Sequence, residues 1–173
     1  MKPESLTEIK KEIKSINPTE LVEICFKLAK FKKENKEFLH YLLYESEYPL
    51  NYAEKVKSSL QPSLESLNKS NYLKMKELRK QLRIVTKHIR YTSSIEVEIT
   101  LLTWFATMMV HYADVRSSNK ALFALFTRQL EKIHKSFAKL HEDLQLDYSE
   151  PYIALLDQAE KFINGFHKER YTL

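Results

Sequence analysis

The chain has 173 residues, of which 43% are hydrophobic and 29% charged, with a formal net charge of +5. This size and composition predict one globular domain, residues 1–173, with a core large enough to be stable without disulfides. The single glycine, Gly165, argues against β-hairpin folds and excludes the glycine-rich loops that bind nucleotide phosphates, because both need glycine at several positions. The single cysteine, Cys25, excludes an intramolecular disulfide and a thiolate metal cluster.

The first 68 residues are predicted to form a small helical layer. Ser5 and Glu8 have the spacing of a capping box, and Asn17 followed by Pro18 is a helix-start signal. These signals and the spacing of the apolar residues predict helices at 6–16, 18–31, 35–48 and 51–60. Residues 61–70, which contain a proline, fit either a further helical turn or a loop.

Residues 69–173 are predicted to form an antiparallel bundle of four long helices, so the expected fold class is all-α, with about seven helices in total. The spacing of apolar residues places the long helices at 71–90, 95–116 and 120–144, followed by one that opens at Ser149 and Pro151. In helix 120–144 the residues expected to point inward are Leu122, Phe126, Leu130, Ile133, Phe137, Leu140 and Leu144.

Helix 95–116 is predicted to lie at the centre of the bundle, because it is apolar around most of its circumference. Its polar residues share one seam, made of Glu96, Thr100, Thr103, Thr107, His111 and Asp114. This seam is either the slit of solvent exposure left to a central helix or the lining of a polar pocket. In the second case, the site of a ligand binder or an enzyme would consist of Thr103, Thr107, His111 and Asp114.

The main functional signal is a row of basic residues in helix 71–90. The apolar residues of this helix have the spacing of a buried face and are Met75, Leu78, Leu82, Val85 and Ile89. Six cations gather on one flank, within about 100° of arc at about 100° per residue. They are Lys76, Arg79, Lys80, Arg83, Lys87 and Arg90. Glu77 is the one carboxylate in the segment, and Ile84 is expected to stand exposed beside the cations, as in a contact surface.

Positive charge is concentrated in the same half of the chain. Residues 1–94 hold 19 Lys and Arg against 12 Asp and Glu, a net charge of +7, whereas residues 95–173 hold 9 against 11, a net charge of −2. The basic row therefore fits three roles. It is a solvated or internally paired helix face, a contact surface for an acidic protein or an anionic membrane, or a phosphate-binding surface for nucleic acid.

Signals for catalysis or metal binding are weak. Two Glu-x-x-His pairs, Glu37 with His40 and Glu131 with His134, lie beside the apolar faces of their helices. The corresponding pairs of di-iron bundles project inward, into the core. We therefore expect no metal, no cofactor and no catalytic residue.

These observations predict a non-enzymatic helical interaction or adaptor protein that binds another protein or a second copy of itself. Two alternatives stay open: a nucleic-acid-binding accessory protein that uses helix 71–90, and a ligand binder or enzyme with a polar pocket at His111 and Asp114. The longest apolar tract, 99–113, is shorter than the roughly 20 residues of a transmembrane helix. The N-terminus lacks the apolar core of a signal peptide, so we expect a cytoplasmic protein.

Overall fold

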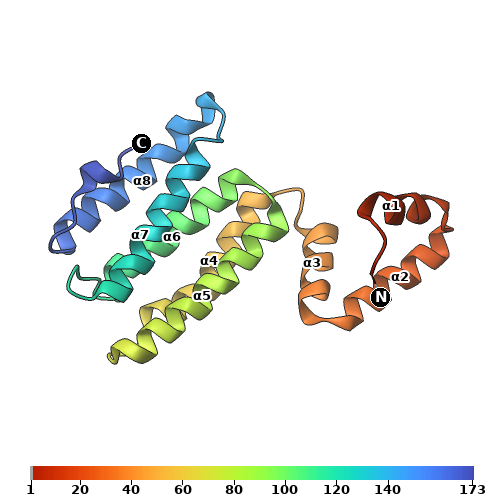
Figure 1. Cartoon of the computed structure of the whole chain (residues 1–173), viewed down its shortest axis with the longest axis horizontal. Helices are drawn as coiled ribbons and strands as arrows, with labels where there is room; N and C mark the ends of the chain where they lie inside the picture. The colour runs from red at the N-terminus through yellow and green to blue at the C-terminus, as the bar shows by residue number, and fades with distance from the viewer. Residues whose placement is uncertain (1) are drawn as a thin grey trace. The chain divides into compact units, whose positions relative to one another are not determined.

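The computed structural model describes residues 2–173 and is all-helical, as the sequence predicts, with no strand in that range (Figure 1). Eight α-helices and one short 3₁₀ helix make up the described chain. They are α1 (Leu6–Ser15), α2 (Pro18–Phe31), α3 (Lys33–Tyr44), α4 (Pro49–Glu65), α5 (Asn71–Thr92), α6 (Ile95–Tyr112), α7 (Lys120–Phe137), α8 (Glu142–Phe162) and η1 (Lys168–Arg170). The helices group into two compact units, of which the first ends at Glu45 and the second comprises Ser46–Leu173.

The first unit contains α1, α2 and α3, and the predicted start signals operate in it. The Ser5 hydroxyl accepts a hydrogen bond from the backbone N–H of Glu8 at 3.3 Å, and Asn17 caps α2 in the same way. The break predicted at 32–34 is a single extended residue, Lys32, at φ −143° and ψ 145°. α2 and α3 pack against each other, yet only Tyr41 is buried among the residues of the three helices.

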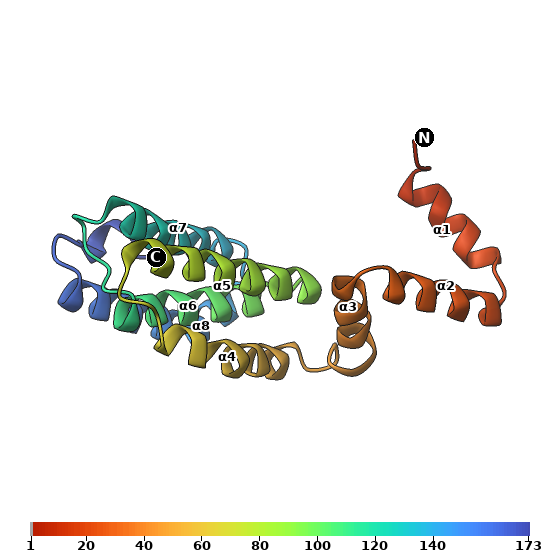
Figure 2. The same cartoon turned by 90° about the horizontal axis from the view of Figure 1, so that it is seen from below.

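In the second unit α6 is the central helix, because it packs against α4, α5, α7 and α8. Figures 1 and 2 show these five helices lying alongside one another. Ten of the 18 residues of α6 are buried, which confirms its predicted central position. Its start is set by Ser94, whose hydroxyl accepts from the N–H of Val97 at 3.1 Å, after Ser93 has turned the chain in the left-handed region at φ 51°.

α4 is longer than predicted and lies in the second unit, although the sequence places it in an N-terminal layer that ends at residue 68. The helix continues through Pro62 to Glu65. Its buried residues are Tyr52, Ala53, Val56, Leu60 and, beyond the predicted end, Leu64. A proline in a helix leaves the carbonyl four residues earlier without its N–H donor. That carbonyl belongs to Ser58, which is exposed and open to water.

The boundary between α7 and α8 differs from the prediction. α7 ends at Phe137, and the N–H of Leu140 turns back to the Phe137 carbonyl at 3.0 Å. α8 then begins at Glu142, where the His141 ring accepts from the N–H of Asp143. Leu140 is buried as expected, but Leu144 is exposed, so its predicted inward position is wrong because the two residues belong to different elements. Pro151 lies inside α8 and does not open it.

The C-terminal segment folds back on α8. Gly165 follows the helix at φ +79°, and a Cβ at this position would meet the Ser117 hydroxyl at 3.0 Å. Tyr152 in α8 donates a hydrogen bond to the Tyr171 carbonyl at 2.8 Å, and the Tyr171 ring stacks on Phe166. Among residues 2–173, no helix combines the length and apolarity that a membrane crossing requires.

Candidate functional site

Six of the seven cations of α5 form one outward surface, which we call the basic stripe and define as Lys76, Arg79, Lys80, Arg83, Lys87 and Arg90. The buried side chains of α5 are Lys74, Met75, Leu78, Gln81 and Val85. At about 100° per residue, the basic stripe is centred nearly opposite this buried face. Five of its six members are exposed, and Lys87 is half-buried. The buried face of α5 is rotated slightly relative to the predicted one. Leu82 and Ile89 are only half-buried, whereas Lys74 and Gln81 are buried.

Most of the basic stripe is not neutralised within the described chain. Lys80 pairs with Glu77, with 3.4 Å between its Nζ and the carboxylate. The side chains of Lys76, Arg79, Arg83 and Arg90 form no hydrogen bond or ion pair with any residue from 2 to 173. Glu96, at the start of α6, accepts a hydrogen bond from the Ser94 hydroxyl at 2.6 Å and forms no ion pair with these four cations.

The apolar residues beside the basic stripe are not those expected. Ile84 is half-buried and does not stand exposed, because it lies between the basic stripe and the buried face of α5. The exposed apolar side chains lie instead at the start of α5, where Tyr72 is 76% exposed and Leu73 is 45% exposed. Tyr72 precedes Lys76 by four residues and therefore shares its helix face.

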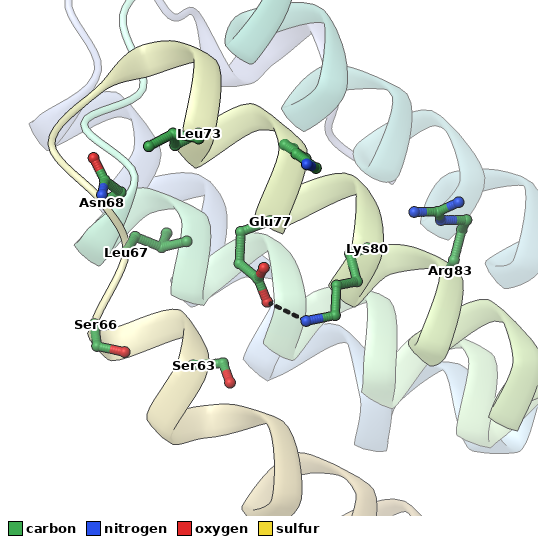
Figure 3. Close-up of a pocket in the computed structure, with 9 residues that line it drawn as sticks. Ser63, Ser66, Leu67, Asn68, Leu73, Glu77, Lys80 and Arg83 are labelled. Carbon is green, nitrogen blue, oxygen red and sulfur yellow. Dashed lines mark hydrogen bonds and ion pairs between the residues drawn. The ribbon is translucent and has the colours of Figure 1, made fainter.

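A surface hollow of about 500 Å³ lies where the end of α4 meets the start of α5 (Figure 3). Its lining residues are Ser63, Ser66, Leu67, Asn68, Leu73, Lys76, Glu77, Lys80 and Arg83. Half of the basic stripe thus borders it. In Figure 3 Glu77 and Lys80 point toward one another, whereas Arg83 points away from that pair. Residues 61–70, left open between helix and loop by the sequence, provide the opposite wall.

The polar seam of α6 does not gather its four site candidates in one place. Asp114 lies beyond the end of α6, is exposed, and pairs with Arg116 at 2.8 Å. It borders a hollow of about 610 Å³ that includes none of the other three. His111 is exposed and forms a hydrogen bond with Gln158 at 3.0 Å. Thr107 donates to the carbonyl of Thr103, whose own hydroxyl is buried without a partner among residues 2–173.

No group of three or more His, Cys, Asp or Glu side chains in the described chain is arranged to hold a metal ion. In the Glu-x-x-His pairs, Glu131 and His134 are both exposed. His40 lies 4.0 Å from the Glu45 carboxylate, and Glu37 lies 3.7 Å from Lys33. Cys25 is half-buried and forms no disulfide.

The first unit has an apolar surface that sequence reasoning missed. Its exposed apolar side chains lie on all three helices and include Leu6, Val22, Phe26, Leu28, Phe31, Leu43 and Tyr44. Phe31 is 76% exposed and Leu43 63% exposed. Large exposed apolar patches mark contact sites in most soluble proteins. Helical spacing places Leu28 and Leu43 on the apolar faces of α2 and α3, and periodicity alone does not tell whether such a face is covered within the same chain.

This apolar surface is hollowed between α2 and α3, with a volume of about 620 Å³, and we call the depression the α2–α3 hollow. Its apolar lining comes from Phe26, Ala29, Leu39, Leu43 and Tyr44, with His40 beside them. Its cationic lining comes from Lys30, Lys32, Lys33 and Lys36. Lys33 pairs with Glu37, but the other three lysines form no ion pair with a described residue.

Comparisons of the chain with family models, with curated proteins and with solved structures found no match. Function must therefore be inferred from the two surfaces themselves. One is cationic and runs along α5. The other is apolar with a cationic rim and lies on α2 and α3.

Proposed function

We propose that this chain acts by binding and not by catalysis, and that its N-terminal unit docks an acidic amphipathic helix of a partner protein. The observation that carries this proposal is the α2–α3 hollow, where exposed apolar side chains are surrounded by lysines. An amphipathic helix that lies in a groove contributes apolar anchors at positions i, i+3, i+4 and i+7, which is a common mode of peptide recognition.

The apolar part of the hollow supports a helical ligand. Phe26 and Leu43 are 57% and 63% exposed, so a ligand that covers them removes much apolar area from water. Burial stabilises by roughly 25 cal/mol per Å² of apolar surface. Clusters of buried aromatic and aliphatic anchors carry most of the binding energy at interfaces. The two helices already pack against each other, so the groove exists before the ligand binds.

The charged part of the hollow supports an acidic ligand over a basic one. Lys30, Lys32 and Lys36 form no ion pair in the described chain, and they lie around the apolar residues. Carboxylates that flank the apolar anchors of a partner helix would meet these ammonium groups at the rim. Rim charges act mainly on association rate and on the choice between partners, and salt screens them.

A labelled synthetic helix tests the proposal by fluorescence anisotropy. The probe carries Leu and Phe at i, i+3, i+4 and i+7 with Glu and Asp on its flanks. We expect Leu43→Ser to weaken its binding by about tenfold, equivalent to about 1.4 kcal/mol. Leu28→Ser is the matched control, because Leu28 is 56% exposed on α2 but does not line the hollow. Circular dichroism checks that both variants keep their helix content.

Charge reversal provides the second arm. The double variant Lys30→Glu with Lys36→Glu should weaken the binding of the acidic probe. The control, Lys10→Glu with Lys14→Glu on α1, changes the net charge equally and should leave the binding of the probe unchanged. Equal binding of a probe whose flanks carry lysine would contradict the proposal. So would the absence of binding by the acidic probe.

A second copy of the chain is the competing occupant. α8 exposes Leu146 and Ile153 beside Asp147, Glu150 and Asp157, which is an acidic face with apolar anchors. Analytical ultracentrifugation distinguishes the two cases. A concentration-dependent oligomer that is lost in both Leu43→Ser and Ile153→Ser would assign the hollow to self-association and overturn the partner proposal.

A further inference from the structure

We propose that the basic stripe of α5 binds single-stranded nucleic acid, with phosphates along the stripe and a base stacked on Tyr72. This inference is independent of the partner proposal, since it uses a different surface in a different unit. Its observations are the outward row of cations, the unpaired state of four of them, an exposed aromatic ring in line with the row, and the adjoining hollow.

The length of the basic stripe matches a run of phosphates. From Lys76 to Arg90 the helix advances about 21 Å, at about 1.5 Å per residue. A strand with stacked bases carries a phosphate about every 3.4 Å, so about six phosphates span that distance. The stripe offers six cations. Three of them, Arg79, Arg83 and Arg90, can make forked contacts with phosphate oxygens, and the lysines act as point charges. A single phosphate group would use only a fraction of this surface.

Tyr72 favours an unpaired strand over a duplex. Its ring is 76% exposed and lies on the same helix face as Lys76 and Arg79, at the N-terminal end of the stripe. Base stacking on an aromatic side chain contributes about 1–3 kcal/mol and needs a base that is free of its neighbours. A lipid headgroup offers no flat ring for this contact, whereas a nucleic acid strand carries one beside every phosphate, so the ring and the cations together point to nucleic acid.

The hollow beside the stripe adds uncharged donors. Ser63 and Asn68 line it together with Lys76, Lys80 and Arg83. The Asn68 side-chain oxygen accepts from the N–H of Ser70 at 2.8 Å, which leaves its NH₂ group for a ligand. Serine hydroxyls and asparagine amides commonly contact phosphate and sugar oxygens next to Arg and Lys. Glu77 is the one carboxylate in this lining, and Lys80 and Gln81 both contact it.

The experiment is a salt titration of the full chain with a labelled single-stranded oligonucleotide of mixed sequence, followed by anisotropy. If about five phosphates are neutralised, the slope of log K against log salt is about −3.5 for a single strand. Binding should then fall by about 100-fold between about 50 mM and about 200 mM salt. Arg79→Glu with Arg83→Glu should weaken binding and make the slope less negative by about 1.4, because two contacts are lost.

The matched control is Arg128→Glu with Lys132→Glu on α7. These two residues are exposed, form no ion pair in the described chain and have the same i, i+4 spacing, so the net charge changes equally. We expect this control to bind nearly as the unchanged chain does. Equal weakening in both double variants would reduce the effect to net charge and overturn the proposal.

Tyr72→Ala distinguishes a nucleic acid strand from other polyanions. It should weaken binding by about tenfold with the salt slope unchanged, as expected for the loss of one stacked base. A duplex of the same sequence, polyglutamate and vesicles with anionic lipids serve as competitors. The proposal fails if any of them binds as tightly as the single strand, if Tyr72→Ala has no effect, or if no binding is seen at low salt.

Discussion

At the scale of single residues, Glu77 sets the charge of the basic stripe. It is the one carboxylate of α5, lies 3.4 Å from Lys80 and accepts from the amide of Gln81. We expect Glu77→Gln to strengthen oligonucleotide binding by about threefold, because the substitution frees Lys80 for a phosphate and removes a repulsive charge. The salt slope should become more negative by about 0.7.

The control for this variant is Glu131→Gln on α7, which removes an exposed carboxylate away from α5 and should leave binding almost unchanged. The amide at position 77 can still accept the hydrogen bond from Gln81. Unchanged or weaker binding in Glu77→Gln would therefore contradict a phosphate contact at Lys80.

Gln129 is a second residue whose surroundings predict a measurable effect. Its side chain is 1% exposed, its NH₂ group donates to the Leu125 carbonyl at 2.8 Å, and its oxygen is buried without a partner in the described chain. An unsatisfied buried acceptor costs about 1–3 kcal/mol. Replacement by methionine, which has a similar length, should raise the free energy of unfolding by about 1 kcal/mol in urea titrations.

Gln145→Met serves as the comparison, because this substitution should lower the free energy of unfolding. The Gln145 amide donates to the carbonyls of Phe137 and Leu140, which close the turn between α7 and α8. Losing these bonds should lower the free energy of unfolding by about 0.5–1.5 kcal/mol. If Gln129→Met is as destabilising as Gln145→Met, the Gln129 oxygen has a hydrogen-bond partner.

At the scale of the helices, the cap of α6 couples stability to pH. The Ser94 hydroxyl accepts from the N–H of Val97 and donates to the Glu96 carboxylate. The hydrogen bond from Ser94 lowers the pKa of Glu96, with a smaller contribution from a backbone hydrogen bond. A carboxyl whose folded pKa is depressed stabilises the fold above its unfolded pKa, and this contribution is lost as the pH falls through the folded pKa.

We therefore expect Ser94→Ala to lower the free energy of unfolding by about 1 kcal/mol at neutral pH. The loss should be smaller in acid, where Glu96 is protonated in both states. Carbon-13 NMR titration should show that the pKa of Glu96 rises in the variant. Ser94→Asn retains a capping oxygen and should recover most of the stability, whereas equal losses at neutral and acidic pH would exclude the Glu96 coupling.

Helix starts could be predicted from sequence better than helix ends and breaks. The caps at Ser5, Asn17 and Asn119 follow from short side chains that accept a backbone hydrogen bond. The α7–α8 boundary could not be predicted in this way, since its cap is His141 and the misleading signal is Pro151. A proline is tolerated inside a helix where the freed carbonyl meets water, as at the exposed Asp147.

At the scale of the whole molecule, the core is unevenly distributed between the two units. Every buried apolar residue of the described chain except Tyr41 lies in Ser46–Leu173. We expect a fragment of residues 46–173 to unfold cooperatively in urea, with a midpoint close to that of the full chain. A shorter fragment, 71–173, should lose cooperativity because it lacks the five buried residues of α4.

Far-UV circular dichroism measures both transitions. For fragment 46–173, the free energy of unfolding should fall by about 1–3 kcal/mol per molar urea, as it does for a small domain. A broad transition for this fragment would show that the first 45 residues are needed for a folded core. Equal cooperativity of fragment 71–173 would show that α4 is dispensable.

The sequence by itself determined the all-α class, the central position of α6 and the outward row of cations on α5, because helical periodicity and capping depend on residues close together in the chain. Only the tertiary structure decided which apolar faces find a partner. It buries Leu64 near the end of α4 and leaves Ile84 half-buried, and it leaves Phe26 and Leu43 exposed. It also places Asp114 at a hollow that His111 does not line. Burial depends on contacts between distant segments, and such contacts leave no periodic signal in either segment alone.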